Sequence, residues 1–437
     1  MKRECFEKLL KWHESRKRKP LVLMGARQVG KTWLMEEFAR ERFGENCVVV
    51  NFMRQQSLCR QLENADIDPA GLVRLLQTAT GKRIIPGKTL LILDEIQECP
   101  SALTSLKFFY EDMPELEVMA AGSLLGLAYG SGKRKESFPV GRVDRLNVYP
   151  MTFSEFLAAN GKESLAETIA DGDWRTVELM SSEYELQLKI YMVTGGMPEA
   201  VDDWCKTGSL TEVRTTQKRI LSDYDSDFKK HAPMELLPKI RLVWNNIPAQ
   251  LSKENKKFIY TALKPGARAR EYEMAIEWLQ DAGMAYMHHR VCPPRLPLAH
   301  YRDFGAFKLF MHDIGLLGAM SALDPGVVLE GNTLFTNFKG ALTEQFVWQE
   351  LKAREVEMGY WTPDSGMAEV DFVVQGRSDV VPLEVKSATN TKAKSLKVYI
   401  EEYEPRLAIK SSLKNYSDSG NVHSLPLYAL GLRIANV

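Results

Sequence analysis

The feature that constrains this chain most is a glycine-bounded segment that follows a short apolar run. Residues 21–24 (LVLM) have the composition of a buried strand, and residues 32–43 (TWLMEEFARERF) show helical spacing of apolar side chains. Between them the sequence matches G-x-x-x-x-G-K-[ST] with Gly25, Ala26, Arg27, Gln28, Val29, Gly30, Lys31 and Thr32. A strand, this loop and a helix in succession predict a phosphate-binding loop.

Each residue type in this loop suits the binding of a nucleoside triphosphate. The glycines let the backbone N–H groups turn toward a phosphate chain, and the helix N-terminus adds partial positive charge. Lys31 is expected to reach the outer phosphates and Thr32 to ligate Mg²⁺. A glycine turn that precedes Lys-Thr by chance is expected in roughly one chain of this length in a hundred. ATP and Mg²⁺ are therefore the predicted ligands.

A second apolar run, residues 89–93 (TLLIL), ends in two carboxylates, Asp94 and Glu95. A buried strand that delivers carboxylates at its C-terminal end suits a Walker B element, in which Asp94 holds Mg²⁺ and Glu95 orients the attacking water. The alternative is an acidic strand end that caps the next helix. Because both motifs follow strands, as ligand sites in open α/β sheets do, we favour the first interpretation.

Two further residues are candidates for contacts with the γ-phosphate. Ser123 follows a third apolar run, residues 116–121, and could sense this phosphate, although serine is also common in turns. Arg142 follows a glycine-rich basic loop at 130–135 and is the candidate arginine finger, acting within the chain or on a second copy in a homo-oligomer. The alternative is that Arg142 only pairs with Asp144 or Glu136.

Composition limits the class of protein. The chain has 437 residues, which predicts roughly three domains, and its 57 basic and 57 acidic residues give zero net charge. This balance excludes a protein coated in basic charge but leaves a local basic groove open. Six cysteines without a C-x-x-C pair exclude a zinc ribbon and a disulfide framework.

No stretch of the sequence has the length and apolarity of a membrane span. The longest mainly apolar stretch, residues 118–128, is interrupted by Gly122, Ser123 and Gly126, and the N-terminus carries charge where a signal peptide needs apolar residues. We expect a cytoplasmic protein that does not contact a membrane.

The middle of the chain is predicted to be mostly helical. Residues 151–206 are expected to form a lid whose position reports the bound nucleotide. Residues 207–300 contain a predicted helix at 256–263, a turn, a second helix from 270 and a strand near 285–291, an order compatible with a winged helix. Arg268 and Arg270 would then contact a nucleic-acid groove, and the alternative is a packing module that leaves both solvated. His288 and His289 face opposite sides of a strand, so they cannot easily ligate one metal ion.

The C-terminal segment gathers a second set of carboxylates. Residues 368–374 alternate at the period of a strand, with Glu369 and Asp371 on one face, and residues 382–387 place Glu384 and Lys386 together. If the two strands pair, three carboxylates and one amine share a face. Asp371 and Glu384 would bind Mg²⁺, and Lys386 would position a hydrolytic water for phosphodiester cleavage. The alternative is a solvated face with cross-strand ion pairs.

These motifs together resemble one family. The sequences GARQVGKT, LLILDEIQECP, AAGSLLG and GRVDRLNVYPMTFSEFL, followed by TGGMPEA, FKLFMHDIGLLGA, NFKGALTEQFVWQEL and EVDFVV with PLEVKS, are similar to prokaryotic AAA-type ATPases whose C-terminal half is a conserved domain of unknown function.

The resemblance implies an α/β fold with a P-loop NTPase core at 1–150, a helical lid at 151–206 and a restriction-endonuclease-like α/β domain at 301–437. Residues 207–300 between them are the winged-helix-like segment that the pattern of elements predicts. It also implies Glu344 as an extra acid in a site similar to that of PD-(D/E)-x-K nucleases, although Ala368 stands where that signature has proline.

Two hypotheses remain open. The first is a Mg²⁺-dependent ATPase that acts on nucleic acid such as DNA, with a possible C-terminal nuclease site. The second is a nucleotide-gated switch or scaffold that binds ATP or ADP and a protein partner, with an inactive nuclease-like domain.

Overall fold

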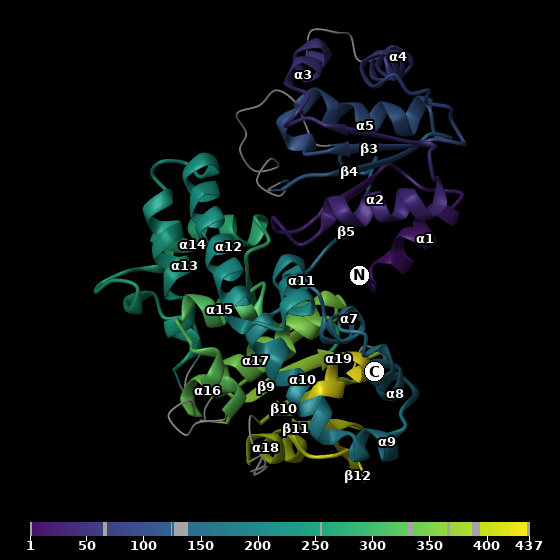
Figure 1. Cartoon of the computed structure of the whole chain (residues 1–437). Helices are drawn as coiled ribbons and strands as arrows, with labels where there is room; N and C mark the ends of the chain where they lie inside the picture. The colour runs from purple at the N-terminus through teal and green to yellow at the C-terminus, as the bar shows by residue number, and fades with distance from the viewer. Residues whose placement is uncertain are drawn as a thin grey trace. The chain divides into compact units, whose positions relative to one another are not determined.

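The computed structural model divides the chain into two compact units, residues 2–149 with 281–283 and residues 150–280 with 284–437. Figure 1 shows the helices and strands of each unit. The structure describes residues 2–63, 68–123, 125, 139–253, 256–330, 336–364, 368–386 and 394–434, with the backbone alone at 336–338.

The described residues of the first unit build a parallel five-stranded sheet in the order β2-β3-β4-β1-β5. Its strands are β1 Leu21–Met24, β2 Cys47–Asn51, β3 Leu90–Asp94, β4 Glu117–Ala121 and β5 Asp144–Asn147. Every residue of β3 and β4 is buried, as expected for parallel strands covered on both faces. The apolar runs that the sequence assigned to strands are therefore strands.

Helices cover both faces of this sheet. They are α1 Phe6–Glu14, α2 Lys31–Arg42, α3 Gln56–Glu63, α4 Pro69–Thr80 and α5 Pro100–Asp112, with a 3₁₀ turn η1 at Ile96–Glu98. Helices α3, α4 and α5 pack on one face through a cluster that includes Val50, Leu93 and Leu106. On the other face Phe38 of α2 contacts the rings of Phe6 and Trp12 in α1, with centroids 5.8 and 6.5 Å apart.

Parallel strands bring the predicted nucleotide-binding residues to one edge of the sheet. The register pairs Leu23 of β1 with Ala121 of β4, and Asp94 of β3 with the same Ala121. The residues that follow β1, β3 and β4 therefore emerge side by side at the carboxyl edge, where open α/β sheets bind ligands.

The second unit begins with the helices predicted to form a lid. They are α7 Phe153–Ala159, α8 Glu163–Asp171, α9 Trp174–Leu179, α10 Ser181–Thr194 and α11 Pro198–Thr207. The helical prediction is correct, but these helices belong to the same compact unit as the C-terminal sheet. The Phe153 N–H donates to Glu350 Oε1 at 2.7 Å, and the Asn415 amide donates to Glu178 at 2.9 Å. The described contacts therefore join these helices to the C-terminal half of the chain and do not leave them as a separate lid.

Two sequence motifs meet in a buried junction of this unit. The Gly196 N–H donates to Asp313 Oδ2 at 2.6 Å, and a Cβ on Gly196 would lie 2.1 Å from the Met151 carbonyl oxygen. The Tyr191 hydroxyl donates to the same Met151 carbonyl at 2.5 Å. Burial raises the pKa of Asp313 to about 6, against the hydrogen bonds it accepts. The glycines of T-G-G-M-P are thus required by close packing.

The rest of the second unit surrounds an eight-stranded mixed sheet in the order β12-β13-β11-β10-β9-β8-β6-β7. Its strands are β6 Ala285–Val291, β7 Arg302–Met311, β8 Met358–Trp361, β9 Val370–Gln375, β10 Val380–Val385, β11 Ala408–Ser412, β12 Ser417–Ser419 and β13 Val422–Pro426. Its remaining helices are α12 Leu210–His231, α13 Leu237–Leu251, α14 Ala269–Asp281, α15 Ile314–Met320, α16 Pro325–Glu330, α17 Thr336–Ala353, α18 Lys394–Tyr403 and α19 Leu430–Ile434, with 3₁₀ turns η2 Tyr260–Ala262, η3 Leu298–Tyr301 and η5 Leu427–Ala429.

The winged-helix prediction for residues 207–300 needs correction in two places. The helix predicted over 256–263 is absent except for the 3₁₀ turn η2, because the Phe258 N–H donates to the Phe307 carbonyl at 2.8 Å and the two rings stack. The predicted boundary at residue 300 also falls between β6 and β7, which form one antiparallel hairpin. That hairpin joins the larger sheet through the pair of Arg290 and Tyr360.

No described helix has the length and apolarity that a membrane crossing requires.

Candidate functional site

The loop between β1 and α2 has the backbone shape that its glycines predict. Gly25 has φ +137°, and a Cβ there would lie 2.2 Å from the Val148 carbonyl oxygen. Gly30 has φ 92° at the N-cap of α2, and Gln28 has φ 66°. Glycine at 25 and 30 removes the strain that a side chain would impose, so the loop can wrap around a ligand.

Lys31 is held by the loop itself. Its Nζ donates to the carbonyl oxygens of Gly25 at 3.0 Å and Ala26 at 2.7 Å. The side chain is buried, and burial lowers the pKa of Lys31 to about 8, although Glu95 and Asp94 act in the opposite direction. The ammonium group can exchange these carbonyl oxygens for phosphate oxygens, which are stronger hydrogen-bond acceptors because they are charged.

Thr32, Asp94 and Asn51 form a polar group beside Lys31. The Thr32 hydroxyl lies 3.1 and 3.3 Å from the two carboxylate oxygens of Asp94, and the Asn51 amide donates to Asp94 Oδ2 at 2.8 Å. Burial, followed by the charge of Glu95, raises the pKa of Asp94. Hydroxyl and carboxylate oxygens are the donors that Mg²⁺ prefers, so these residues fit a Mg²⁺ held with a nucleotide.

Glu95 is oriented by two neighbours. Its Oε2 accepts hydrogen bonds from Gln97 Nε2 at 2.5 Å and from Ser123 Oγ at 3.2 Å. Glu95 has φ 50°, a conformation that non-glycine residues seldom adopt and that is often found at functional sites. A Cβ on Gly122 would lie 2.2 Å from Gln97 Oε1, so Gly122 is needed for this arrangement.

Arg142 lies away from this group. It precedes β5, whose first residue Asp144 pairs with Leu21 at the start of β1, whereas the loop follows the end of β1. Arg142 is therefore at the opposite edge of the sheet, where its Nε pairs with Glu111 at 3.2 Å and its guanidinium lies over the Tyr110 ring. An arginine finger within the same chain is inconsistent with this position, and so is the alternative pairing with Asp144. Glu136 and the basic loop at 130–135 lie outside the described residues.

Three residues of the first unit were not identified from the sequence. Buried Arg3 donates to the Val29 carbonyl at 3.0 Å and to the Tyr149 carbonyl at 2.6 Å, which ties the loop to the segment that follows β5. Asn51 could have been found, because it is a polar residue that ends an apolar strand beside β3. Gln97 and Arg3 carry no such signal, since Gln97 is an ordinary polar residue of the η1 turn and the partners of Arg3 come from distant segments.

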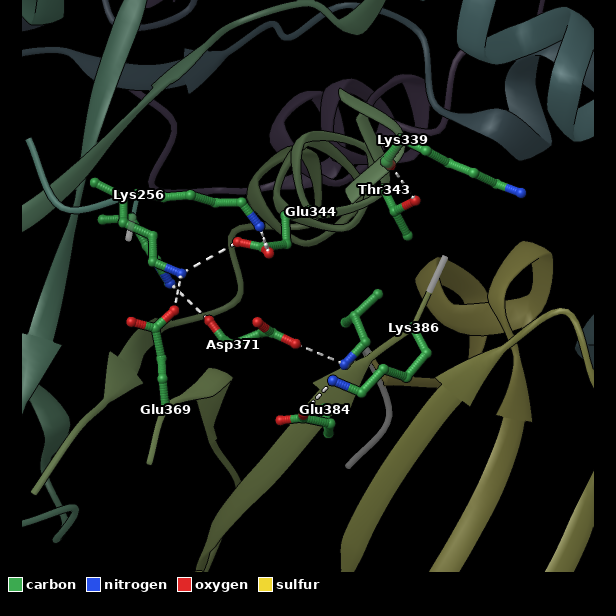
Figure 2. A network of polar contacts seen from close by, with 11 residues as sticks. Lys256, Lys339, Thr343, Glu344, Glu369, Asp371, Glu384 and Lys386 are labelled. Carbon is green, nitrogen blue, oxygen red and sulfur yellow. Dashed lines mark hydrogen bonds and ion pairs between the residues drawn. The ribbon is translucent and has the colours of Figure 1, made fainter. Parts of the chain in front are cut away.

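The predicted pairing of the two C-terminal strands is present. β9 and β10 are antiparallel, with Phe372 opposite Leu383, so Asp371 and Glu384 come together at the end of the ladder. Asp371 Oδ2 accepts the Val385 N–H at 2.8 Å, and Lys386 Nζ donates to Glu384 Oε1 at 2.5 Å. Figure 2 shows these residues with Glu344 and Glu369 on the same side of the hairpin. We call Glu344, Glu369, Asp371 and Glu384 the carboxylate cluster.

This cluster is less exposed than the sequence suggested. Glu384 is 3% exposed and every residue of β10 is buried, while Glu369 and Lys386 keep about a third of their side-chain surface exposed. The alternative of a fully solvated face is therefore wrong. Burial, followed by the charges of Glu344 and Glu384, raises the pKa of Asp371 well above its usual value. Burial also raises the pKa of Glu384, against the effect of Lys386.

Two lysines that the sequence did not single out enter the cluster. Lys308 of β7 is fully buried and pairs with Glu344 at 3.1 Å and Glu369 at 2.7 Å. Lys256 also pairs with Glu344. Burial acts to raise the pKa of Glu344, but the two lysines outweigh it and lower this pKa to about 2.

The two adjacent histidines do not form a metal site. His288 is buried among the rings of Phe310, Tyr360 and Phe372, while His289 packs against Phe304 and Phe307 on the other side of β6. Across the described ranges, no group of three or more His, Cys, Asp or Glu side chains is arranged to hold a metal ion.

Comparison with known families assigns the first unit to a class. Residues 17–157 match the family model described as an AAA domain, and this range contains the loop, Asp94, Glu95 and Ser123. Residues 17–157 are therefore similar to AAA-type P-loop domains. Residues 185–326 and 339–430 match two domains of unknown function, DUF8612 and DUF4143.

Solved structures give a weaker likeness, and no curated protein sequence matches. The chain is similar to the Walker-type ATPase PABY2304 of Pyrococcus abyssi, with 15% identity and a TM-score of 0.45 over 73% of this chain and 95% of that one. It is also similar to the ORC2 protein of Aeropyrum pernix, with 12% identity and a TM-score of 0.37 over 77% and 90%. For Cdc6p of Pyrobaculum aerophilum the identity is 12% and the TM-score 0.27 over 79% and 96%. These values do not identify an activity or a partner.

Proposed function

We propose that the first unit binds Mg²⁺-ATP at the loop between β1 and α2 and hydrolyses it. The observation that carries the proposal is the meeting of three elements at one sheet edge. Lys31 and Thr32 begin α2, Asp94 ends β3, and Ser123 follows β4 and donates to Glu95. The match of residues 17–157 to an AAA domain supports the same chemistry.

Lys31 and the loop supply phosphate binding. Lys31 exchanges its two carbonyl partners for the outer phosphates, and the N–H groups at the start of α2 add the partial positive charge of a helix N-terminus. Thr32 and Asp94 are the residues that would hold Mg²⁺, which neutralises charge on the phosphates when bound. Asn51 keeps the Asp94 carboxylate turned toward Thr32.

Glu95 is the proposed group that orients the attacking water. Its carboxylate is fixed by Ser123 and Gln97 rather than by Asn51 or Thr32, so it remains separate from the carboxylate that would hold Mg²⁺. Ser123 follows β4, and it is therefore placed to contact Glu95 and a γ-phosphate at once. We propose Ser123 as the residue that links the two.

Binding of a fluorescent ATP analogue, with and without Mg²⁺, tests the phosphate-binding part of this proposal. Lys31→Ala is expected to weaken binding at least about tenfold, because a charge-assisted contact to phosphate is lost. Asp94→Asn is expected to remove the enhancement by Mg²⁺. Lys88→Ala removes an exposed lysine of the same unit and should bind like the wild type. Wild-type affinity in Lys31→Ala would contradict the assignment.

The surface of α14 favours a protein partner over DNA. Arg268 and Arg270 are exposed, as the winged-helix hypothesis requires, but the exposed face of the helix continues with Glu271, Glu273 and Glu277. A helix that reads a DNA groove lies beside phosphates, where three carboxylates would be repelled. We therefore favour the hypothesis of a nucleotide-gated switch that binds a protein.

Hydrolysis measured with and without single- and double-stranded DNA separates the two partners. We expect rates that do not respond to DNA at low or moderate salt. A several-fold stimulation that disappears as salt rises would return nucleic acid to the account, since phosphate contacts are salt-dependent. Phosphodiester cleavage is not part of the proposal, because the oxygens of Glu344 are already paired with lysines.

A further inference from the structure

The carboxylate cluster of the second unit has the residue types of a divalent metal site but contains its own cations. Two strands and one helix supply its carboxylates: Glu369 precedes β9, Asp371 lies in β9, Glu384 in β10 and Glu344 in α17. The cation comes from β7, the edge strand of the same sheet, as the ammonium of Lys308.

Lys308 lies between two of the carboxylates. Its Nζ is 3.1 Å from Glu344 Oε2 and 2.7 Å from Glu369 Oε1, and the residue has no exposed surface. The Tyr360 ring, whose centroid is 5.0 Å from this nitrogen, adds a further contact that favours a cation. Lys256 donates to the other oxygen of Glu344. Both oxygens of Glu344 are therefore committed to ammonium groups.

The other two carboxylates are partly committed as well. Asp371 Oδ2 accepts the Val385 N–H, and Glu384 Oε1 accepts from Lys386. Glu384 Oε2 is buried and has no hydrogen-bond partner among the described residues. This unpaired oxygen could serve as one ligand of a metal ion. Mg²⁺, however, requires a near-octahedral set of oxygens. Glu344 and Glu369 cannot complete that set while they bind Lys308.

We propose that Lys308, assisted by Lys256, is a built-in replacement for the divalent cation of this site. Four carboxylates face three ammonium groups, Lys256, Lys308 and Lys386, so the cluster is neutralised almost completely without a metal. A divalent cation would have to approach the fully buried ammonium group of Lys308 and the half-buried one of Lys256, which repel it. The cluster holds β7, β9, β10 and α17 together and does not support metal-assisted cleavage.

Mn²⁺ binding to the full-length, nucleotide-free chain tests this proposal. Two measurements are made on each protein: the electron paramagnetic resonance signal of free Mn²⁺, and thermal unfolding with Mn²⁺ or with chelator. The proteins compared are the wild type, Asp371→Asn, Lys308→Met and the double variant Lys308→Met with Glu384→Gln. Met keeps most of the volume of Lys. Lys397→Met, which removes a lysine whose side chain is 78% exposed on α18, is the matched control.

We expect wild type, Asp371→Asn and Lys397→Met to give the same free Mn²⁺ signal. Lys308→Met is expected to unfold at a lower temperature in chelator and to regain stability with Mn²⁺, with binding at least about tenfold tighter than wild type. The added Glu384→Gln should abolish that gain.

Two results would overturn the proposal. One is a wild type that binds Mn²⁺ at a site that Asp371→Asn removes. The other is a folded Lys308→Met that gains no Mn²⁺ binding. If Lys308→Met does not fold, the comparison of wild type with Asp371→Asn still decides.

Discussion

The charge of Lys31 depends on whether phosphate is present. Burial among the carbonyl oxygens of its own loop lowers the pKa of Lys31 to about 8. A bound triphosphate favours the ammonium form, so binding raises this pKa and takes up a proton at alkaline pH. In the free protein at alkaline pH, burial thus lowers the fraction of Lys31 that is protonated, and binding of the triphosphate restores the full charge.

Nucleotide affinity is therefore expected to fall with pH in a defined window. Below about pH 8 the free protein already carries the ammonium, and affinity should be flat. Above that pKa the dissociation constant should rise by about tenfold per pH unit until the pKa of the bound state is reached. Titration of an ATP analogue between about pH 7 and 10 measures this.

Lys31→Arg is the control for this pH dependence, because a guanidinium stays charged throughout the range. It is expected to bind more weakly than wild type but without the alkaline loss. A wild-type affinity that stays constant across the range would show that Lys31 does not titrate in the free protein.

Single residues also mark the limit of sequence interpretation at this scale. The loop, Asp94 and Glu95 could be identified because each follows an apolar strand, and parallel pairing then brings them together. Lys308 has a recognisable sequence signal, since it is a lone charge inside the apolar run AFKLFM. Its partners Glu344 and Glu369 lie in other elements, and only the folded sheet reveals them.

At the scale of elements, local sequence predicts the secondary structure correctly where a strand is buried along its whole length. It fails where a contact with a distant residue determines the local conformation. The strands of the first sheet were predictable because their apolar runs are buried on both faces. The helix expected at 256–263 is absent because Phe258 makes a backbone hydrogen bond and a ring contact with Phe307. These contacts stabilise the fold more than the helix propensity of so short a segment would. Helix boundaries in the middle of the chain carried no information about which unit each helix joins.

The junction at Gly196 gives a prediction at this scale. Gly196→Ala should lower the free energy of unfolding of the second unit by about 1–3 kcal/mol, because its Cβ would meet the Met151 carbonyl oxygen at 2.1 Å. Gly305→Ala, at an exposed position where a Cβ meets only the flexible Asp303 side chain at 3.3 Å, should change it by less than about 0.5 kcal/mol. Chemical denaturation of both variants makes the comparison, and equal effects would contradict the role of the junction.

For the whole molecule, the division into two units differs from the division suggested by the sequence. The helices predicted to serve as a lid pack against α17 and the start of α15 through Phe153, Tyr191 and Gly196. The sequence could not show this, because the partners Glu350, Asp313 and Gln349 are more than a hundred residues away. Amphipathic spacing reveals that a helix has a buried face but not what covers it.

Fragments of the chain test this division. Residues 150–437 are expected to unfold cooperatively, because they contain both sides of the junction. Residues 208–437, which begin after α11, should not, because Glu350, Asp313 and Gln349 lose their partners. Thermal unfolding followed by circular dichroism compares the two. Cooperative unfolding of the shorter fragment would show that the helices before residue 208 are a separate module.

Hydrolysis of Mg²⁺-ATP by the first unit, with Glu95 as the residue that orients water, is the proposed activity of the whole molecule. The most direct test is steady-state hydrolysis by wild type and Glu95→Gln, with nucleotide binding measured on the same samples. We expect Glu95→Gln to bind ATP with near wild-type affinity. Its rate of hydrolysis should be lower than that of the wild type by a factor of about a hundred or more. An unchanged hydrolysis rate in this variant, or no Mg²⁺-dependent hydrolysis by the wild type, would contradict the account.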